Sequence, residues 1–429
     1  MMERAISQLV PVARHEIRAV AWAFAWFFFV LLGQYVLRPV RDTMGIAGGA
    51  SNLRWLFLAT FLAMLIAVPV YALLVARLPR RVLVPVVYRF FTLSLLVFWL
   101  MMRLSGTGLA RWTAWIFFVW MGVYSLFSVS IFWSFLADVF SSRQGQRLFG
   151  LISGGGTLGA LCGSLVASQC VCWLGVANLL LIPAMLLELT LICAGRLGRL
   201  AGQFDPASHG AGEPEPTGGG MLAGITSILR SRYLFGISGY LFLATFSGTI
   251  VYCQQAEIVQ TAIGDDVGRT RLFAEINLAV QVLTFGLQTF VTARIIRGFG
   301  LPATLCLLPV LSLVGFAMLG VAPVLAVLVV VEIARRVTIY GIAEPARVVL
   351  FTVVTREEKY KTKSFIDTVV FRGGDAVAGQ FFAGLRGLGL GLAAIAWVML
   401  PVAIVWTVLG WILGRHELRL AHARSPQPD

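Results

Sequence analysis

The chain has 429 residues, of which 59% are hydrophobic and 13% are charged, and its mean hydropathy is +0.86. A soluble globular protein of this composition could not cover its own core with polar surface, so that class is excluded. The formal net charge of +14 does not indicate a nucleic-acid partner, because most Lys and Arg fall in the loops on one side of the expected membrane spans. We therefore predict a multi-pass protein of the cell inner membrane with both termini in the cytoplasm.

Twelve apolar runs have the length of about 20 residues that a helix needs to cross a bilayer. In chain order they lie near residues 19–37, 53–76, 82–102, 112–135, 148–171, 177–195, 233–256, 269–293, 301–320, 323–346, 364–385 and 389–413. The sequence thus predicts an all-α polytopic membrane protein with 12 transmembrane helices.

A Pro/Gly-rich stretch at residues 201–228 has nothing to bury and is expected to be a cytoplasmic linker. It separates two six-helix bundles, residues 1–200 and 229–429, which resemble copies of one another. Tyr35, Arg54, Arg77, Arg80 and Pro85 of the first half recur at a constant offset as Tyr252, Arg271, Arg294, Arg297 and Pro302. Such a parallel repeat is typical of the major facilitator arrangement.

Charged residues within apolar runs are candidates for function, because an ionisable group at bilayer depth is costly unless it faces protein or a wet cavity. In the first half these are Arg38 and Arg41, at the end of the first run, and Asp138, at the end of the fourth. The alternatives are that the arginines extend to lipid headgroups and that Asp138 is a neighbour of Arg143 and Arg147.

The eighth run carries polar residues every three or four positions, with Glu275 near its outer end. They are Asn277, Gln281, Thr284, Gln288 and Thr292, which share one helical face. Because amides facing lipid would be unsatisfied, this stripe is expected to face the bundle. The stripe serves either hydrogen bonding between helices or a water-filled path, and the sequence does not distinguish the two.

The tenth and eleventh runs hold the remaining candidates. Glu332 and Arg336 lie four residues apart, which suits an internal ion pair, and Arg347 follows. The eleventh run begins after Lys359, Lys361 and Lys363 and contains Asp367, Arg372 and Asp375. The predicted substrate-binding residues are therefore Arg38, Arg41, Asp138, Glu275, Gln281, Arg336, Arg347, Arg372 and Asp375.

The fifth run contains the nucleotide-binding pattern G-x-G-x-x-G at Gly154, Gly156 and Gly159. That pattern has physical meaning only between a strand and a soluble helix, so here it is a false positive. Gly155, Gly159 and Gly163, spaced four apart, instead predict a smooth face for close helix packing.

Cysteines and histidines do not suggest a chemical site. The six cysteines lie in or beside apolar runs without metal-ligand spacing, and the four histidines lie in the termini or the central loop. We expect no metal site, no cofactor and no enzymatic activity.

The run from Arg347 through TREEKYKTKSFIDTVVFRGGD resembles the nucleotide transporter family, the ATP:ADP antiporters of intracellular bacteria and plastids. The matching residues are Lys361, Lys363, Ile366, Asp367, Arg372, Gly373 and Gly374, with support from YVLRPVRD after the first run and from FWSFLADVF around Asp138. The resemblance implies a twelve-span ATP-binding antiporter of the major facilitator group. One position departs from the family pattern, since Asp375 stands where those exchangers carry a basic residue.

The leading hypothesis is a secondary transporter that moves an anionic or zwitterionic solute by alternating access. Arginines would hold the anion, and Asp138, Glu275 and Asp375 would pair with them or take up a coupling proton. The solute is a nucleotide or another phosphorylated or carboxylated metabolite.

The partners of the protein would be this small molecule and the lipid bilayer, and we expect the protein to be a monomer. Other classes are a membrane-embedded transferase, which the lack of histidine in the outer loops disfavours, and a non-transporting partner or lipid scramblase of the same fold.

Overall fold

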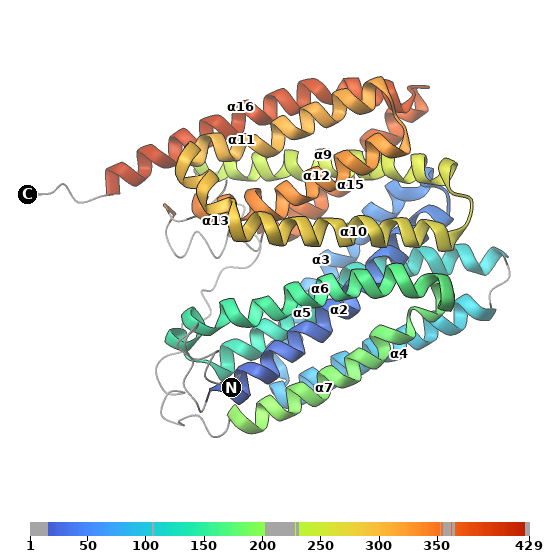
Figure 1. Ribbon diagram of the computed structural model, residues 1–429, viewed down its shortest axis with the longest axis vertical. Helices are drawn as coiled ribbons and strands as arrows, with labels where there is room; N and C mark the ends of the chain where they lie inside the picture. Colours follow the sequence, from blue (N-terminus) through green and yellow to red (C-terminus); the bar gives the residue numbers. More distant parts are fainter. Residues whose placement is uncertain are drawn as a thin grey trace, which may run out of the picture. The chain divides into compact units, whose positions relative to one another are not determined.

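The computed structural model describes residues 16–104, 107–201, 231–351 and 365–424, together with residues 228, 353, 354 and 362, and within them every regular element is helical (Figure 1). The first part contains α2 (Ile17–Ala47), a 3₁₀ turn η1 (Ala50–Asn52), α3 (Leu53–Arg77), α4 (Arg80–Leu104), α5 (Thr107–Val139), α6 (Ser142–Asn178) and α7 (Leu181–Ala201). The second contains α9 (Arg232–Ala262), α10 (Asp266–Phe290), α11 (Thr292–Val321), α12 (Leu325–Thr338), η3 (Ile339–Ala343), α13 (Glu344–Leu350), η4 (Ile366–Val370), α15 (Phe371–Gly387) and α16 (Leu392–Arg424).

Nine helices in the described part of the chain are long and apolar enough to cross a membrane. The other three expected spans coincide with α10, with α12 to α13, and with η4 to α15, all of which are shorter or more polar. Large apolar side chains such as Trp173, Val321 and Leu388 are 78% or more exposed, as expected where lipid replaces water. The fold is that of an all-α polytopic membrane protein, and it is consistent with twelve spans.

The helices form two compact units. Unit 1 comprises residues 1–48, 66–215 and 265–278, and unit 2 comprises residues 49–65, 216–264 and 279–429. Helices α3 and α10 are therefore each divided between the units. The predicted linker at 201–228 lies almost entirely outside the described residues, so the division of the chain at that linker stays a prediction.

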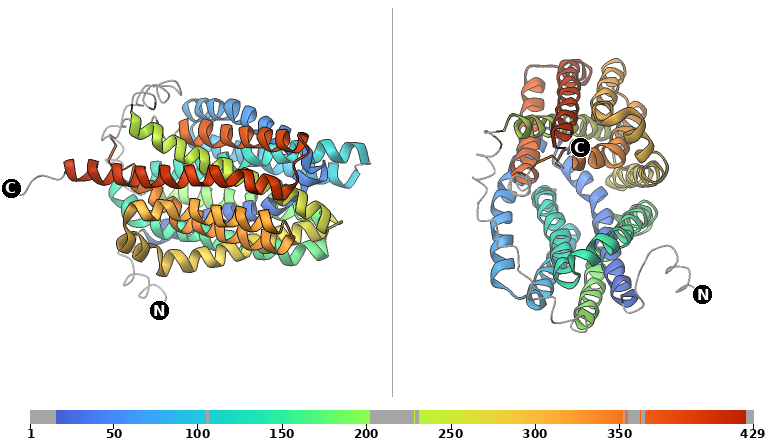
Figure 2. Two further views of the ribbon diagram at one scale, coloured as in Figure 1. Left: turned by 90° about the horizontal axis from the view of Figure 1, so that it is seen from above. Right: turned by 90° about the vertical axis from the view of Figure 1, so that its left-hand side faces the viewer.

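In unit 1, α2 runs alongside α6 (Figure 2), and the glycines of α6 make this approach possible. A Cβ at Gly155 would lie 2.6 Å from the carbonyl oxygen of Phe24, and one at Gly159 or Gly163 would collide with the next carbonyls along α2. Only hydrogen fits between the two backbones at these positions. The predicted packing face is confirmed.

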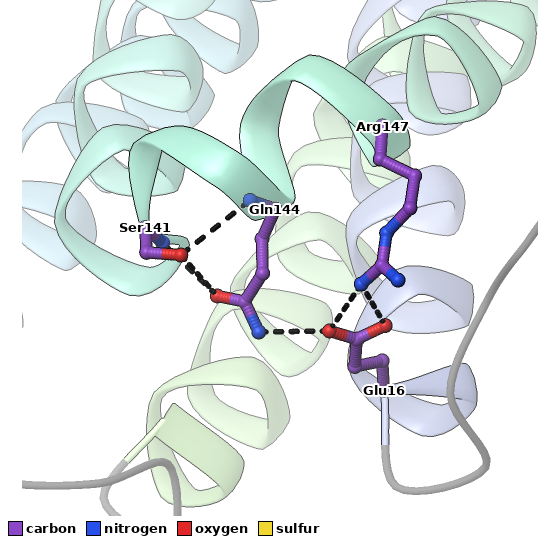
Figure 3. Close-up of polar contacts among 4 residues, drawn as sticks. All are labelled: Glu16, Ser141, Gln144 and Arg147. Carbon is purple, nitrogen blue, oxygen red and sulfur yellow. Dashed lines mark hydrogen bonds and ion pairs between the residues drawn. The ribbon is translucent and has the colours of Figure 1, made fainter.

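A buried carboxylate joins the first turns of α2 and α6 (Figure 3). Glu16, 2% exposed, lies 2.7 Å from Arg147 and accepts a hydrogen bond from Gln144 at 2.8 Å. Gln144 also completes a capping box with Ser141 at the start of α6. Arg147, considered above as a neighbour of Asp138, therefore has an ion pair with Glu16.

In unit 2, the core lies where α9, α11 and α16 meet. Trp406 is 1% exposed, and the hydroxyl of Tyr240 donates to the carbonyl of Leu305 at 2.7 Å, so the polar end of this buried ring is satisfied. This core fixes the position of α9, which forms one wall of the site described next.

Candidate functional site

Two of the expected spans are not regular helices. The tenth changes from α to π geometry at η3 before continuing as α13, and the eleventh begins with the π-helical η4 before α15. The sequence predicts single helical runs at both places. Pro345 explains the first break, because proline has no N–H to donate and its ring clashes with the preceding turn. Single π turns inside helices are frequent at functional sites.

Neighbouring helices donate hydrogen bonds to backbone carbonyl groups at this break. The hydroxyl of Thr292 donates to the carbonyl of Gly341 at 2.7 Å, and the amide of Gln288 donates to the carbonyl of Tyr340 at 3.0 Å. The polar stripe predicted on the eighth run is buried at Asn277, Gln281, Thr284 and Thr292, although Gln288 is exposed. At Gln288 and Thr292, the stripe serves hydrogen bonding between helices.

A cavity of about 210 Å³ lies beside the two π segments, entirely within unit 2. Helix α9 contributes one wall, the tenth span a second and α15 a third. The lining residues are Tyr240, Leu241, Ala244, Thr245, Gly248, Thr249, Leu308, Arg335, Ile339, Ala343, Glu344, Arg347, Phe371 and Asp375. The wall is mostly apolar, with two arginines and two carboxylates placed in it.

Three arginines at or beside this cavity each pair with a carboxylate three residues away along the chain. The separations are 3.1 Å for Arg335 and Glu332, 3.1 Å for Arg347 and Glu344, and 3.4 Å for Arg372 and Asp375. Arg336 lies 3.9 Å from the same Glu332, so the predicted pair is confirmed, but Arg335 is the nearer partner. The cluster therefore combines four guanidinium groups with three carboxylates.

Asp375 connects α15 to α9. It accepts a hydrogen bond from the hydroxyl of Thr249 at 2.6 Å and lies 3.4 Å from Arg372. Both contacts fix the orientation of this carboxylate at the wall of the cavity. The departure from the family pattern at Asp375 thus occurs at a residue that lines the cavity.

Gly248 makes room for Arg335. A Cβ at Gly248 would lie 2.8 Å from Nη1 of Arg335, a residue that is itself 8% exposed. The Nε of Arg335 has no hydrogen-bond partner among the described residues. A buried guanidinium with donor capacity to spare can bind an incoming acceptor.

The other predicted site residues lie elsewhere. In unit 1, Arg41 is 2.7 Å from the buried Asp42 and lies over the ring of Phe118, and Arg38 lies over the ring of Tyr35. Both arginines are half-buried. Asp138 is exposed, and Glu275 is exposed and pairs with Arg271 at 2.8 Å.

In unit 2, Arg336 and Gln281 are buried but are not among the residues that line the cavity, whereas Arg347 and Asp375 line it. Sequence reasoning missed Tyr240, Thr249 and above all Arg335. The side chains of Lys359, Lys361, Lys363 and Asp367 lie outside the described part of the structure.

No family model matches the sequence, and no curated protein sequence matches it. Solved structures do. A bacterial homologue of the iron transporter ferroportin, in an inward-facing state, matches with a TM-score of 0.65 and 11% identity over 94% of this chain and 98% of that chain.

A bacterial homologue of the human lysosomal transporter Spinster, inward-facing and unoccupied, matches with a TM-score of 0.58 and 14% identity over 97% of this chain and 100% of that one. An auto-inhibited peptide transporter of the POT family matches with a TM-score of 0.61 and 13% identity over 96% and 98%. The chain therefore has the major facilitator fold of these transporters. None of the three is described as a nucleotide antiporter, so that resemblance stays a prediction.

Proposed function

We propose that this protein is a secondary transporter that moves a small organic anion across the inner membrane by alternating access. The observation that carries the proposal is the cavity of unit 2, where buried Arg335 and half-buried Arg347 reach a largely apolar pocket at the break of the tenth span. Broken helices beside charged groups are the usual construction of a solute site in secondary transporters. The structural neighbours support the class of function through the fold they share with this chain.

In the empty state, the pairs of Arg335 with Glu332 and of Arg347 with Glu344 lower the cost of burying charge. A carboxylate or phosphate can take hydrogen bonds from the same guanidinium groups, because the fork of donors matches either group. Binding then exchanges an internal partner for the solute. The carboxylate that is released is free to take up a proton, which would couple solute movement to a proton gradient.

The charge of the lining favours a solute with few negative charges. Arg335 and Arg347 are matched there by Glu344 and Asp375, so a triphosphate would meet two carboxylates as well as two guanidinium groups. ATP/ADP exchange remains the alternative that the resemblance to the nucleotide transporters favours.

The test begins with thermal stabilisation of the purified protein by nucleotides, sugar phosphates and mono- and dicarboxylates, since a ligand that binds only the folded state raises the melting temperature. The solute that raises the melting temperature most is then tested for counterflow in reconstituted vesicles. Counterflow of labelled ATP against ADP is measured in parallel. We expect exchange of a small anion that is lost in Arg335→Gln. If no solute exchanges, a non-transporting role for this fold is favoured.

A further inference from the structure

Beyond this cavity, unit 2 contains a second and larger one, of about 440 Å³. It follows the first along the same two helices, since Cys253 lies about one turn beyond Thr249 on α9 and Gly379 one turn beyond Asp375 on α15. The 3₁₀ turn η1 and the start of α3 close its remaining side. With the predicted topology, the C-terminal ends of α9 and α15 and the start of α3 lie on the non-cytoplasmic side. The volume is in the range typical of sites for small molecules.

Arg54 lines this cavity without an ion pair among the described residues. Its Nε is buried and has no hydrogen-bond partner there, and its guanidinium lies over the ring of Trp55, 5.1 Å from the centroid. A buried donor left unsatisfied is destabilising unless a ligand or water completes it. An acceptor bound in the cavity would complete it.

The second cation of the cavity is already engaged. Arg386 lies 3.0 Å from Glu257 and donates to the carbonyl of Leu390 at 2.9 Å. The cavity therefore has two guanidinium groups against one carboxylate, which leaves a net positive charge on the side of Arg54.

The position of Arg54 is fixed by the backbone around it. A Cβ at Gly379 would lie 3.2 Å from the Cα of Arg54, so the glycine allows α15 to approach the start of α3. The backbone N–H of Ala50 donates to the side chain of Gln260 at 3.1 Å, which holds η1 against α9. Arg54 is thus presented to the cavity by contacts that do not involve its own guanidinium group.

We infer that this outer cavity is a second binding site, which takes the carboxylate or phosphate group of an anion on Arg54, with Arg386 as the neighbouring cation. The group could come from a free solute anion or from an anionic lipid headgroup. In either case the recognition is by a planar guanidinium with unused donors. The site differs from the inner cavity in its residues, so it can be removed without altering Arg335 or Arg347.

The test is equilibrium binding of radiolabelled inorganic phosphate to the purified full-length protein in detergent, with succinate as competitor. Arg54→Gln should weaken binding at least about tenfold or remove one equivalent at saturation, because a charge-assisted contact is lost. Arg54→Lys should bind more weakly than wild type but more tightly than Arg54→Gln, since lysine keeps the charge but lacks the planar fork of donors. Glu257→Gln should tighten binding about threefold, because Arg386 loses its internal partner. Arg103→Gln is the matched control, an exposed arginine of unit 1 that donates to Asn178.

Native mass spectrometry with added phosphatidylglycerol distinguishes the two sources. Lipid retention that is lost in Arg54→Gln identifies a headgroup, whereas phosphate binding to delipidated protein that succinate displaces and that Arg54→Gln loses identifies a free anion. Size-exclusion profiles and melting curves establish that each variant is folded, and Glu257→Gln tests the site by a gain even if Arg54→Gln does not fold. The inference is overturned if wild type binds neither probe, if Arg54→Gln binds like wild type, or if Glu257→Gln weakens binding.

Discussion

Substitution of Gly248 by alanine tests the inner cavity with a single added methyl group. The new Cβ would lie 2.8 Å from Nη1 of Arg335. An ordinary contact begins at 3.4 Å, so the guanidinium must retreat by about 0.6 Å. Since Nη2 of Arg335 is only 3.1 Å from Glu332, the displacement changes the geometry of the ion pair.

The effect on stability should be small because two terms oppose each other. Lengthening the Arg335–Glu332 contact by about 0.6 Å costs roughly 1 kcal/mol with an effective dielectric constant of about 20. Replacing glycine by alanine within a helix returns about 1 kcal/mol. A bound anion experiences the same displacement of the guanidinium without any compensation, so we expect its KM to rise about fivefold, the equivalent of about 1 kcal/mol.

The assay is counterflow in reconstituted vesicles, with the solute that stabilises wild type most, combined with melting curves of the purified variants. Gly195→Ala in α7 is the control, because a Cβ there meets no atom within 4 Å; it should leave KM unchanged. Gly248→Leu should abolish exchange. A KM for Gly248→Ala within twofold of wild type would refute the assignment of Arg335 to the solute.

Three further predictions concern other contacts. Arg372→Ala should abolish counterflow while the protein still elutes as a folded species, because the change removes a cation beside the cavity and leaves Asp375 bonded to Thr249 at 2.6 Å; full activity would remove Arg372 from the site. Glu344→Gln should retain counterflow but lose the response of net uptake to an imposed pH gradient, since the amide that replaces the carboxylate released from Arg347 cannot take up a proton. Gly159→Ala should lower the melting temperature by about 2–8 °C, because the added Cβ collides with the backbone of α2, and an unchanged value would contradict the close packing of α2 and α6.

Local spacing was enough to predict some of these features. The glycines of α6 at intervals of four and the pair of Glu332 with Arg336 both depend on the geometry of a single regular helix. The buried polar face of α10 follows from the same periodicity. The apolar runs likewise correspond to the observed helices to within a few residues at most ends.

The same reasoning selected Arg336 in place of Arg335, and the π segment explains why. In a regular α-helix, Arg335 and Arg347 would lie about 120° apart around the axis, which does not suggest a common cavity. The wider turn of η3 between them changes that relation, and both residues line the cavity. Asp138 and Glu275 were chosen for charge within apolar sequence, but both are exposed, because apolar neighbours in the sequence do not establish that a side chain is buried.

Three expected spans do not qualify by length and hydropathy, and all three are associated with the inner cavity. The tenth and eleventh spans line the cavity, and the eighth span, α10, contacts the break in the tenth. Gln288 of α10 donates to the carbonyl of Tyr340 at this break, and Thr292 at the start of α11 donates to the carbonyl of Gly341. This association has a physical cause. The polar or interrupted face of a helix must find hydrogen-bond partners within protein, so that face cannot point to lipid. Spans with weak hydropathy are therefore the first place to look for the solute of this chain, although α9, which lines the same cavity, does qualify as a span by hydropathy.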